Sequence, residues 1–126
     1  MENILGKIID CTKLKICQKN YNNVLLRLSK KINNNEPLNV VFLVSENQKW
    51  GYQSLYDLSK NDKLFKPLIL INLHRDIHKR KIKRKPNISE NVEFFRQKGL
   101  DFELLYEDKK YKNLFEFSPD IVFYDQ

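Results

Sequence analysis

Residues 39–56 read NVVFLVSENQKWGYQSLY, and this stretch decides the fold. Val40 to Val44 is a continuous apolar run rich in β-branched residues, which is typical of a strand buried on both faces of a parallel sheet. A polar turn follows the run, and residues 53–61 then predict a short helix. In an open α/β sheet, the loop that leaves the first strand lies at the ligand crevice. The stretch therefore predicts both the fold and the edge of the sheet at which a ligand would bind.

The remainder of the chain continues the alternation of strands and helices. Buried apolar runs predict strands over residues 67–73, 102–106 and 121–124, and helices are predicted over residues 87–99 and 111–117. Strands that alternate with helical connections form right-handed crossovers and a parallel sheet. We predict an α/β fold with a Rossmann-like parallel sheet of about four strands in the order 3-2-1-4, with helices on both faces.

A helical segment precedes the predicted sheet. Apolar residues recur at helical spacing through residues 3–32, but residues 10–15 interrupt the pattern, so either two helices or one bent helix is expected. Residues 33–37 read NNNEP and end the helix, because Pro cannot continue it and Asn favours turns. The chain therefore divides into an N-terminal helical segment, residues 1–36, and a Rossmann-like domain, residues 37–126. A homo-oligomer formed through the helical segment is a further expectation.

Composition excludes several classes of protein. The 41% hydrophobic content can build a core, which argues against global disorder. No apolar run approaches the roughly 18 residues that span a bilayer, and no signal peptide is apparent. Cys11 and Cys17 are too few for a disulfide scaffold and too far apart for a CxxC metal pair. We therefore expect a cytoplasmic protein, peripheral at most on the inner face of the cell membrane.

The positive charge of the chain is concentrated in one segment. The net charge is +7, and the twelve residues from His74 to Lys85 contribute +6 of it. This segment leaves the second predicted strand at the ligand-binding edge, and Lys and Arg pair with phosphate through charge-assisted hydrogen bonds. We predict that it contacts an anionic acceptor or a membrane surface; the alternative is a solvated loop that keeps the protein soluble. Its cations are Arg75, Lys79, Arg80, Lys81, Lys83, Arg84 and Lys85.

Candidate crevice residues follow the first predicted strand. Ser45, Glu46 and Asn47 could serve as polar ligands or as helix caps, and Trp50 and Tyr52 either shape a pocket or pack the following helix onto the sheet. No glycine-rich phosphate loop of the GxGxxG type is present.

The two histidines do not predict a metal site. His74, Asp76 and His78 have an i, i+2, i+4 spacing, but no further ligand motif accompanies them and the neighbouring cations would repel a divalent ion. A general-base role for either histidine has no support in the sequence. No catalytic residue, metal or cofactor is therefore assigned to this chain.

Several short motifs resemble the N-terminal domain of the CDP-glycerol glycerophosphotransferase family, which builds bacterial cell-surface polymers such as teichoic acid. The similarity covers about residues 38–126, and residues 1–37 contribute nothing to it. The motifs that carry it are Val41-Phe42-Leu43-Val44, Trp50, Ser54-Leu55-Tyr56, Phe65-Lys66-Pro67, Phe94-Phe95 with Lys98-Gly99, and Pro119-Asp120-Ile121-Val122-Phe123-Tyr124.

The resemblance implies part of a GT-B enzyme with two Rossmann-like domains. The N-terminal domain would face a lipid-linked acceptor at the membrane, and a C-terminal domain outside this chain would hold the CDP-glycerol donor. The acceptor hydroxyl would attack the donor phosphorus and CMP would leave, with positioning and charge stabilisation carrying the transfer. The chain departs from the family by stopping after the fourth predicted strand, and neither histidine matches the family's catalytic motifs. We therefore expect the Rossmann-like domain to be truncated and the chain alone to be inactive.

A stand-alone, non-catalytic module that binds a polyanion or nucleic acid is the alternative function. The basic segment alone would allow it. The sequence argues against nucleic acid, because the cations lack interleaved aromatic residues for base stacking and no recognition motif appears.

Overall fold

The computed structural model describes residues 4–72, 88–108 and 110–124. The chain divides into two units, which we call the helical unit (Met1–Glu36) and the sheet unit (Pro37–Gln126). Within the described ranges, no helix combines the length and the apolarity needed to cross a bilayer.

The helical unit is one continuous helix, α1 (Ile4–Asn33). The alternative of two helices is therefore wrong, because residues 10–15 contain neither Pro nor Gly and their polar side chains continue the helix. The helix ends in a Schellman motif, in which the Glu36 N–H donates to Lys31 O and the Asn35 N–H donates to Ile32 O. Asn35 adopts the left-handed conformation that this motif requires, with φ 54°.

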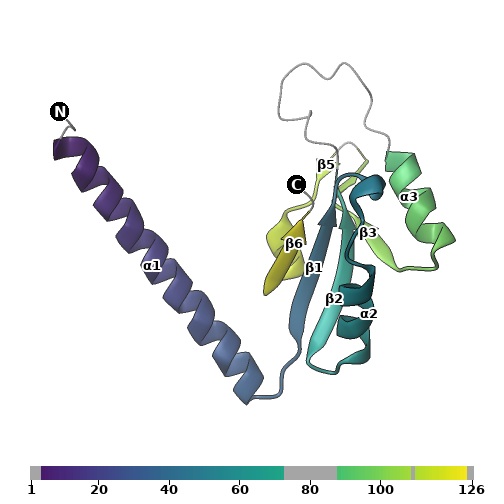
Figure 1. Ribbon diagram of the computed structural model, residues 1–126, viewed down its shortest axis with the longest axis horizontal. Coiled ribbons are helices and arrows are strands. Elements are labelled where there is room, and N and C mark those ends of the chain that lie inside the picture. The colour runs from purple at the N-terminus through teal and green to yellow at the C-terminus, as the bar shows by residue number, and fades with distance from the viewer. Residues whose placement is uncertain (1–3, 73–87, 109, 125–126) are drawn as a thin grey trace. The chain divides into compact units, whose positions relative to one another are not determined.

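The sheet unit is built on a parallel sheet of four strands in the order β3-β2-β1-β6 (Figure 1). The strands are β1 (Leu38–Val44), β2 (Phe65–Ile71), β3 (Phe102–Leu104) and β6 (Ile121–Tyr124). In register, Val41 of β1 lies opposite Leu68 of β2 on one side and Val122 of β6 on the other. The α/β class, the parallel sheet and the predicted order 3-2-1-4 are confirmed.

An aromatic core holds the helices against one face of the sheet. Helices α2 (Gln53–Asn61) and α3 (Ile88–Gln97) contribute Tyr56 and Phe95, which pack against alternate residues of β1 and β2. Phe42 is completely buried at the centre, and its ring lies 5.8 Å from Tyr56 and 5.4 Å from Phe123. Apolar burial of this kind is the main force that stabilises the unit.

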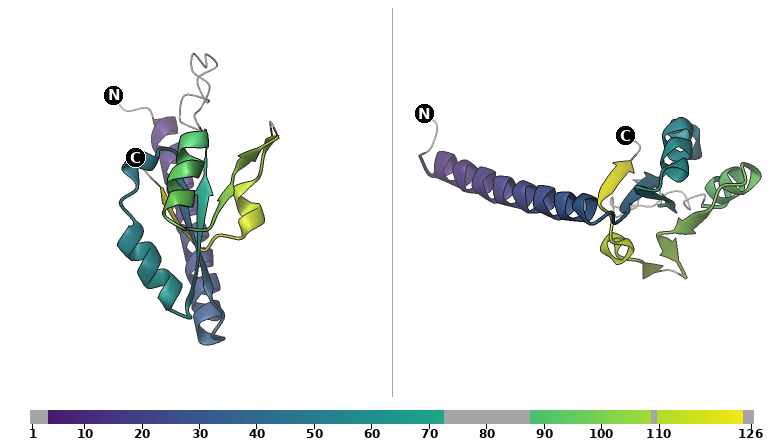
Figure 2. Two further views of the ribbon diagram at one scale, coloured as in Figure 1. Left: turned by 90° about the vertical axis from the view of Figure 1, so that its right-hand side faces the viewer. Right: turned by 90° about the horizontal axis from the view of Figure 1, so that it is seen from below.

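The opposite face of the sheet is covered differently from the prediction. The short helix predicted over residues 111–117 is present only as the 3-10 helix η3 (Leu114–Phe117), which follows a hairpin of β4 (Tyr106–Glu107) and β5 (Lys110–Tyr111). Asn113 caps the start of η3 in a capping box with Glu116, and Ser118 ends it in the left-handed conformation, with φ 46°. Leu114 and Phe117 pack against Val41 and Leu70, so η3 lies on the side of the sheet opposite α2 (Figure 2).

The amino ends of β1 and β6 are joined by polar contacts. The Asn39 N–H donates to the Asp120 carboxylate at 2.8 Å, and the Asp120 N–H donates to Asn39 O at 2.9 Å. The Asn39 side-chain amide donates to Ser118 O at 2.9 Å. These bonds fix the register of β6, so Asp120 has a structural role at the edge of the sheet away from the strands' carboxyl ends.

Candidate functional site

The strand order places a topological switch point between β1 and β6. The chain runs from β1 outward through β2 to β3 and then crosses back to β6 on the other side of β1. In open parallel sheets, ligands bind outside the carboxyl ends of the two strands at such a point. Here the segments that leave those ends begin at Ser45, after β1, and at the end of β6 with Tyr124. We call this part of the sheet unit the carboxyl edge.

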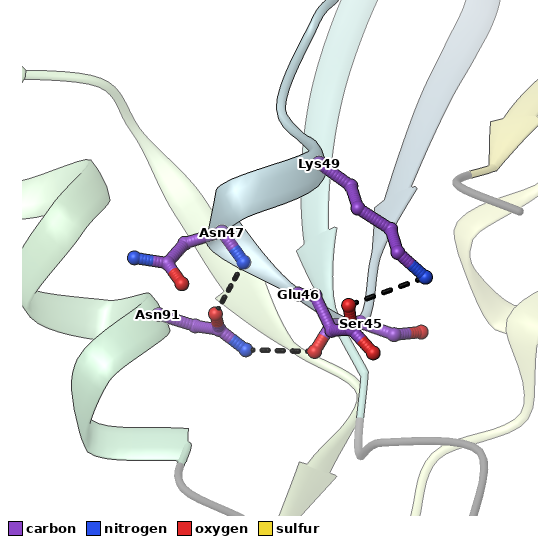
Figure 3. A network of polar contacts seen from close by, with 5 residues as sticks. All are labelled: Ser45, Glu46, Asn47, Lys49 and Asn91. Carbon is purple, nitrogen blue, oxygen red and sulfur yellow. Dashed lines mark hydrogen bonds and ion pairs between the residues drawn. The ribbon is translucent and has the colours of Figure 1, made fainter.

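A buried asparagine fixes the turn after β1. The turn contains the 3-10 helix η1 (Asn47–Lys49), and Asn91 reaches it from α3 (Figure 3). The Asn91 side-chain amide donates to Ser45 O at 3.0 Å, and its carbonyl oxygen accepts from the Asn47 N–H at 2.8 Å. Asn91 is only 6% exposed, so both polar ends of its side chain are satisfied by the turn. The arrangement holds the backbone of the carboxyl edge in one conformation.

Glu46 and Lys49 form an ion pair across the same turn. The Lys49 Nζ lies 3.2 Å from Glu46 Oε2, and the two side chains are 43% and 26% exposed (Figure 3). A pair this exposed contributes little to stability. Its effect is local, because it places a cation beside the only carboxylate of the turn.

Trp50 is part of the aromatic core. Its ring lies 5.1 Å from Phe95 and 5.9 Å from Phe42, both edge-on, and its indole N–H donates to the Gln53 side chain at 3.1 Å. These contacts match the packing role for Trp50, which was one of the two alternatives that the sequence left open. A role for Trp50 in lining a crevice stays a prediction.

Tyr52 connects the two strands of the switch point. Its hydroxyl donates to Tyr124 O at 3.0 Å, at the end of β6. Its ring packs between Phe42 and Phe123, with centroid distances of 5.7 and 5.8 Å. Tyr52 therefore lies at the carboxyl edge, where its hydroxyl ties the turn after β1 to β6.

The seven cations of the basic segment lie outside the described residues, as do His74, Asp76 and His78. The described elements on either side fix what the segment connects: β2 ends at Ile71, and α3 begins at Ile88. The Asn72 N–H donates to Val44 O at 2.8 Å, so the chain leaves β2 directly beside the end of β1. The connection that carries +6 by sequence thus starts at the carboxyl edge.

Among the described residues, no group of three His, Cys, Asp or Glu side chains could hold a metal ion. In the core, the pKa of Tyr56 is raised first by burial and then by the nearby Asp101 and Asp57 carboxylates. Its hydroxyl stays protonated at neutral pH, which suits a core residue and not a base.

Sequence reasoning missed Asn91 and Tyr124. Both could have been noticed by position: Asn91 is the single polar residue on the apolar face of a predicted amphipathic helix, and Tyr124 ends a strand at the predicted edge. Of the predicted crevice residues, the structure brings together Ser45, Glu46 and Asn47 in one turn, with Trp50 and Tyr52 partly buried and packed against the core.

Comparison of the chain with protein-family models, with curated proteins and with solved structures found no significant match.

Proposed function

We propose that this chain is the acceptor-side portion of a glycerophosphotransferase-like enzyme of bacterial cell-surface polymer synthesis, in which the carboxyl edge and the basic segment contact an anionic acceptor or the membrane surface. The transfer itself would need a donor-binding domain outside this chain. The chain alone is expected to transfer nothing, because no catalytic residue of the family has a counterpart in it.

One observation supports the proposal: a basic connection of +6 leaves β2 directly beside the end of β1, which is one of the two strands that flank the switch point. A ligand outside the end of β1 would meet the Asn91-fixed turn and, beside it, the start of the basic segment. Outside the segment the chain is nearly neutral, so charge attraction would favour this edge over other surfaces. A phosphate-rich acceptor or an anionic lipid surface has the matching chemistry.

The experiment compares two variants of equal net charge. In the first, Lys81, Lys83, Arg84 and Lys85 of the basic segment are changed to Gln. In the matched control, four exposed lysines elsewhere are changed to Gln: Lys13, Lys19, Lys63 and Lys66. Binding to a poly(glycerol phosphate) polymer, and to vesicles with and without anionic lipid, is measured at several salt concentrations.

The proposal predicts that the first variant loses binding and that the control keeps most of it. The difference should be largest at low salt, because screening weakens charge contacts between exposed groups. Equal binding by both variants at every salt concentration would contradict the proposed role of the basic segment.

A stand-alone polyanion-binding module is the second candidate, favoured by the charge run alone. Gel-shift measurements with duplex and single-stranded oligonucleotides separate the two candidates. Tight oligonucleotide binding at physiological salt would favour the module, whereas preference for the glycerol phosphate polymer would favour the enzyme portion.

A further inference from the structure

Large apolar side chains lie exposed along α1. Leu14 is 68% exposed, Tyr21 59% and Ile32 50%, with Leu25 at 42%. The helix is also rich in Asn and in β-branched residues, which are weaker helix formers than Ala or Leu. Since helices in proteins gain most of their stability by packing an apolar face, α1 requires a partner surface.

The apolar residues of α1 follow a heptad pattern. Positions a and d, alternately three and four residues apart, fall at Cys11, Leu14, Gln18, Tyr21, Leu25, Leu28 and Ile32. We call these seven positions the seam. They cover three heptads, and six of the seven are apolar or Cys, which is the pattern of a coiled coil.

The charged residues of α1 agree with this seam. Four of its cations, namely Lys13, Lys19, Arg27 and Lys30, occupy the outer b, c and f positions, so they lie away from a partner helix. Asp10 occupies a g position and Lys15 the e position of the next heptad, and both are exposed. In a parallel pair of helices, the g residue of one chain faces that e residue of the other. Two chains in register would therefore place opposite charges together on each side of the seam.

The polar seam position indicates the orientation. Gln18 is at an a position, and a single polar a residue sets register and oligomer state in parallel dimers, because it meets its own equivalent across the seam. In an antiparallel pair the a residues meet d residues, and Gln18 would lie against an apolar or aromatic side chain. The Leu residues at d positions, Leu14 and Leu28, are the choice typical of two-stranded coils.

We propose that α1 forms a parallel, in-register, two-stranded coiled coil with a second copy of this chain, along the seam from Cys11 to Ile32. The sheet unit and its carboxyl edge would then be present twice in each assembly. Two basic segments in one assembly would strengthen attachment to a polymer or a surface through multivalency. That last consequence rests on the proposed function, whereas the dimer does not.

The first test uses neighbouring leucines of the full chain. Leu25 is in the seam, and Leu26, which is 70% exposed, occupies an outer b position. Sedimentation equilibrium over a range of concentrations should give twice the mass of one chain for the unchanged protein and for Leu26→Asp. Leu25→Asp should raise the dissociation constant by at least about 100-fold, because each chain would bury a carboxylate without a partner.

The second test measures orientation through Cys11. A parallel pair brings the two Cys11 residues face to face, and a disulfide needs Cα atoms about 4.4–6.8 Å apart. Mild oxidation should link the chains through Cys11, so Cys11→Ser should abolish the link and Cys17→Ser, at a g position beside the seam, should keep it. Exchange of the charges gives a third readout: Asp10→Lys should weaken the dimer several-fold, and adding Lys15→Asp should restore it.

The results that would overturn the proposal are distinct. A monomer at all concentrations would contradict the proposed dimer. Equal effects of Leu25→Asp and Leu26→Asp on the dissociation constant would contradict the proposed seam. A dimer that Cys11 does not link shows another orientation, and a mass of three chains shows another oligomer. Loss of polymer binding by the basic-segment variant without a change in mass leaves the coiled coil intact, so failure of the two proposals can be told apart.

Discussion

The two units of this chain use apolar residues in opposite ways. In the sheet unit, Phe42, Ile69 and Leu70 are completely buried within the unit. In the helical unit, Leu14 is 68% exposed and Tyr21 59%. The sheet unit therefore carries its own core, although Phe115 and Leu58 on its surface are 80% and 70% exposed. In α1, by contrast, none of residues 10–33 is buried. An apolar side chain stabilises the fold of its own unit only where it is buried within that unit. An exposed one can pack against another chain.

The largest expected effect is the loss of the central aromatic ring. Phe42→Ala should lower the free energy of unfolding of the sheet unit by about 3–5 kcal/mol, because it leaves a cavity where four aromatic rings meet. Leu26→Ala in α1 should change it by less than about 0.5 kcal/mol. Urea denaturation, followed by the fluorescence of Trp50, measures the free energy of unfolding of both variants. Similar losses in the free energy of unfolding for the two variants would contradict the difference between the units.

A smaller effect is expected at the carboxyl edge. Asn91→Ala should cost about 1–3 kcal/mol, because it removes both hydrogen bonds to the turn after β1 and leaves buried polar groups behind. Glu90→Ala, an exposed neighbour on the same helix, is the control. Thermal unfolding compares the two. Unchanged stability of the Asn91 variant would mean that the turn does not depend on this side chain.

Much of the sheet unit could be predicted from the sequence because its strands are continuous apolar runs. Val40 to Val44 and the run before Asn72 had to be buried, and helical connections between strands allow few topologies. Residues 111–117 could not be predicted in the same way. Their fold depends on the left-handed Asp108, with φ 51°, and on the Asn113 cap, which are local choices that an apolar pattern does not reveal.

The candidate site was predictable only in part. The turn after β1 was found because the topology places it at the ligand edge. The partner that fixes it, Asn91, lies 46 residues from Ser45 in the chain, and sequence spacing carries no signal for a contact of that range. Trp50 was ambiguous for a related reason, since its packing depends on Phe95 from another helix.

The backbone conformation at the end of α3 sets the cost of a substitution there. Gly99 follows α3 with φ +65°, and no atom lies within 4 Å of a Cβ added there. Gly99→Ala should therefore cost only the conformational strain, about 1–2 kcal/mol. The midpoint of urea denaturation reports it. A larger loss would indicate a contact at Gly99 that the structure does not contain.

The smallest effect appears only in alkali. Burial raises the pKa of Tyr56 above its ordinary value of 10.0, with Asp101 and Asp57 adding to the shift. The folded state therefore holds this proton more tightly than the unfolded state, so the stabilisation is complete below about pH 10 and is lost as the pH rises through the folded pKa. Tyr56→Phe should reduce the fall in stability above pH 10. An unchanged dependence of stability on pH would show that Tyr56 is not the cause of the fall.

Hydrogen exchange of the full chain, at concentrations below and above the dissociation constant from sedimentation, tests the difference between the units most directly. Amides of β1 should exchange slowly and at the same rate at both concentrations, because their protection comes from a core within the unit. Amides of α1 should exchange quickly in the dilute sample and become protected as the dimer forms. Protection of α1 that does not change with concentration, or a β1 without protection, would contradict the account.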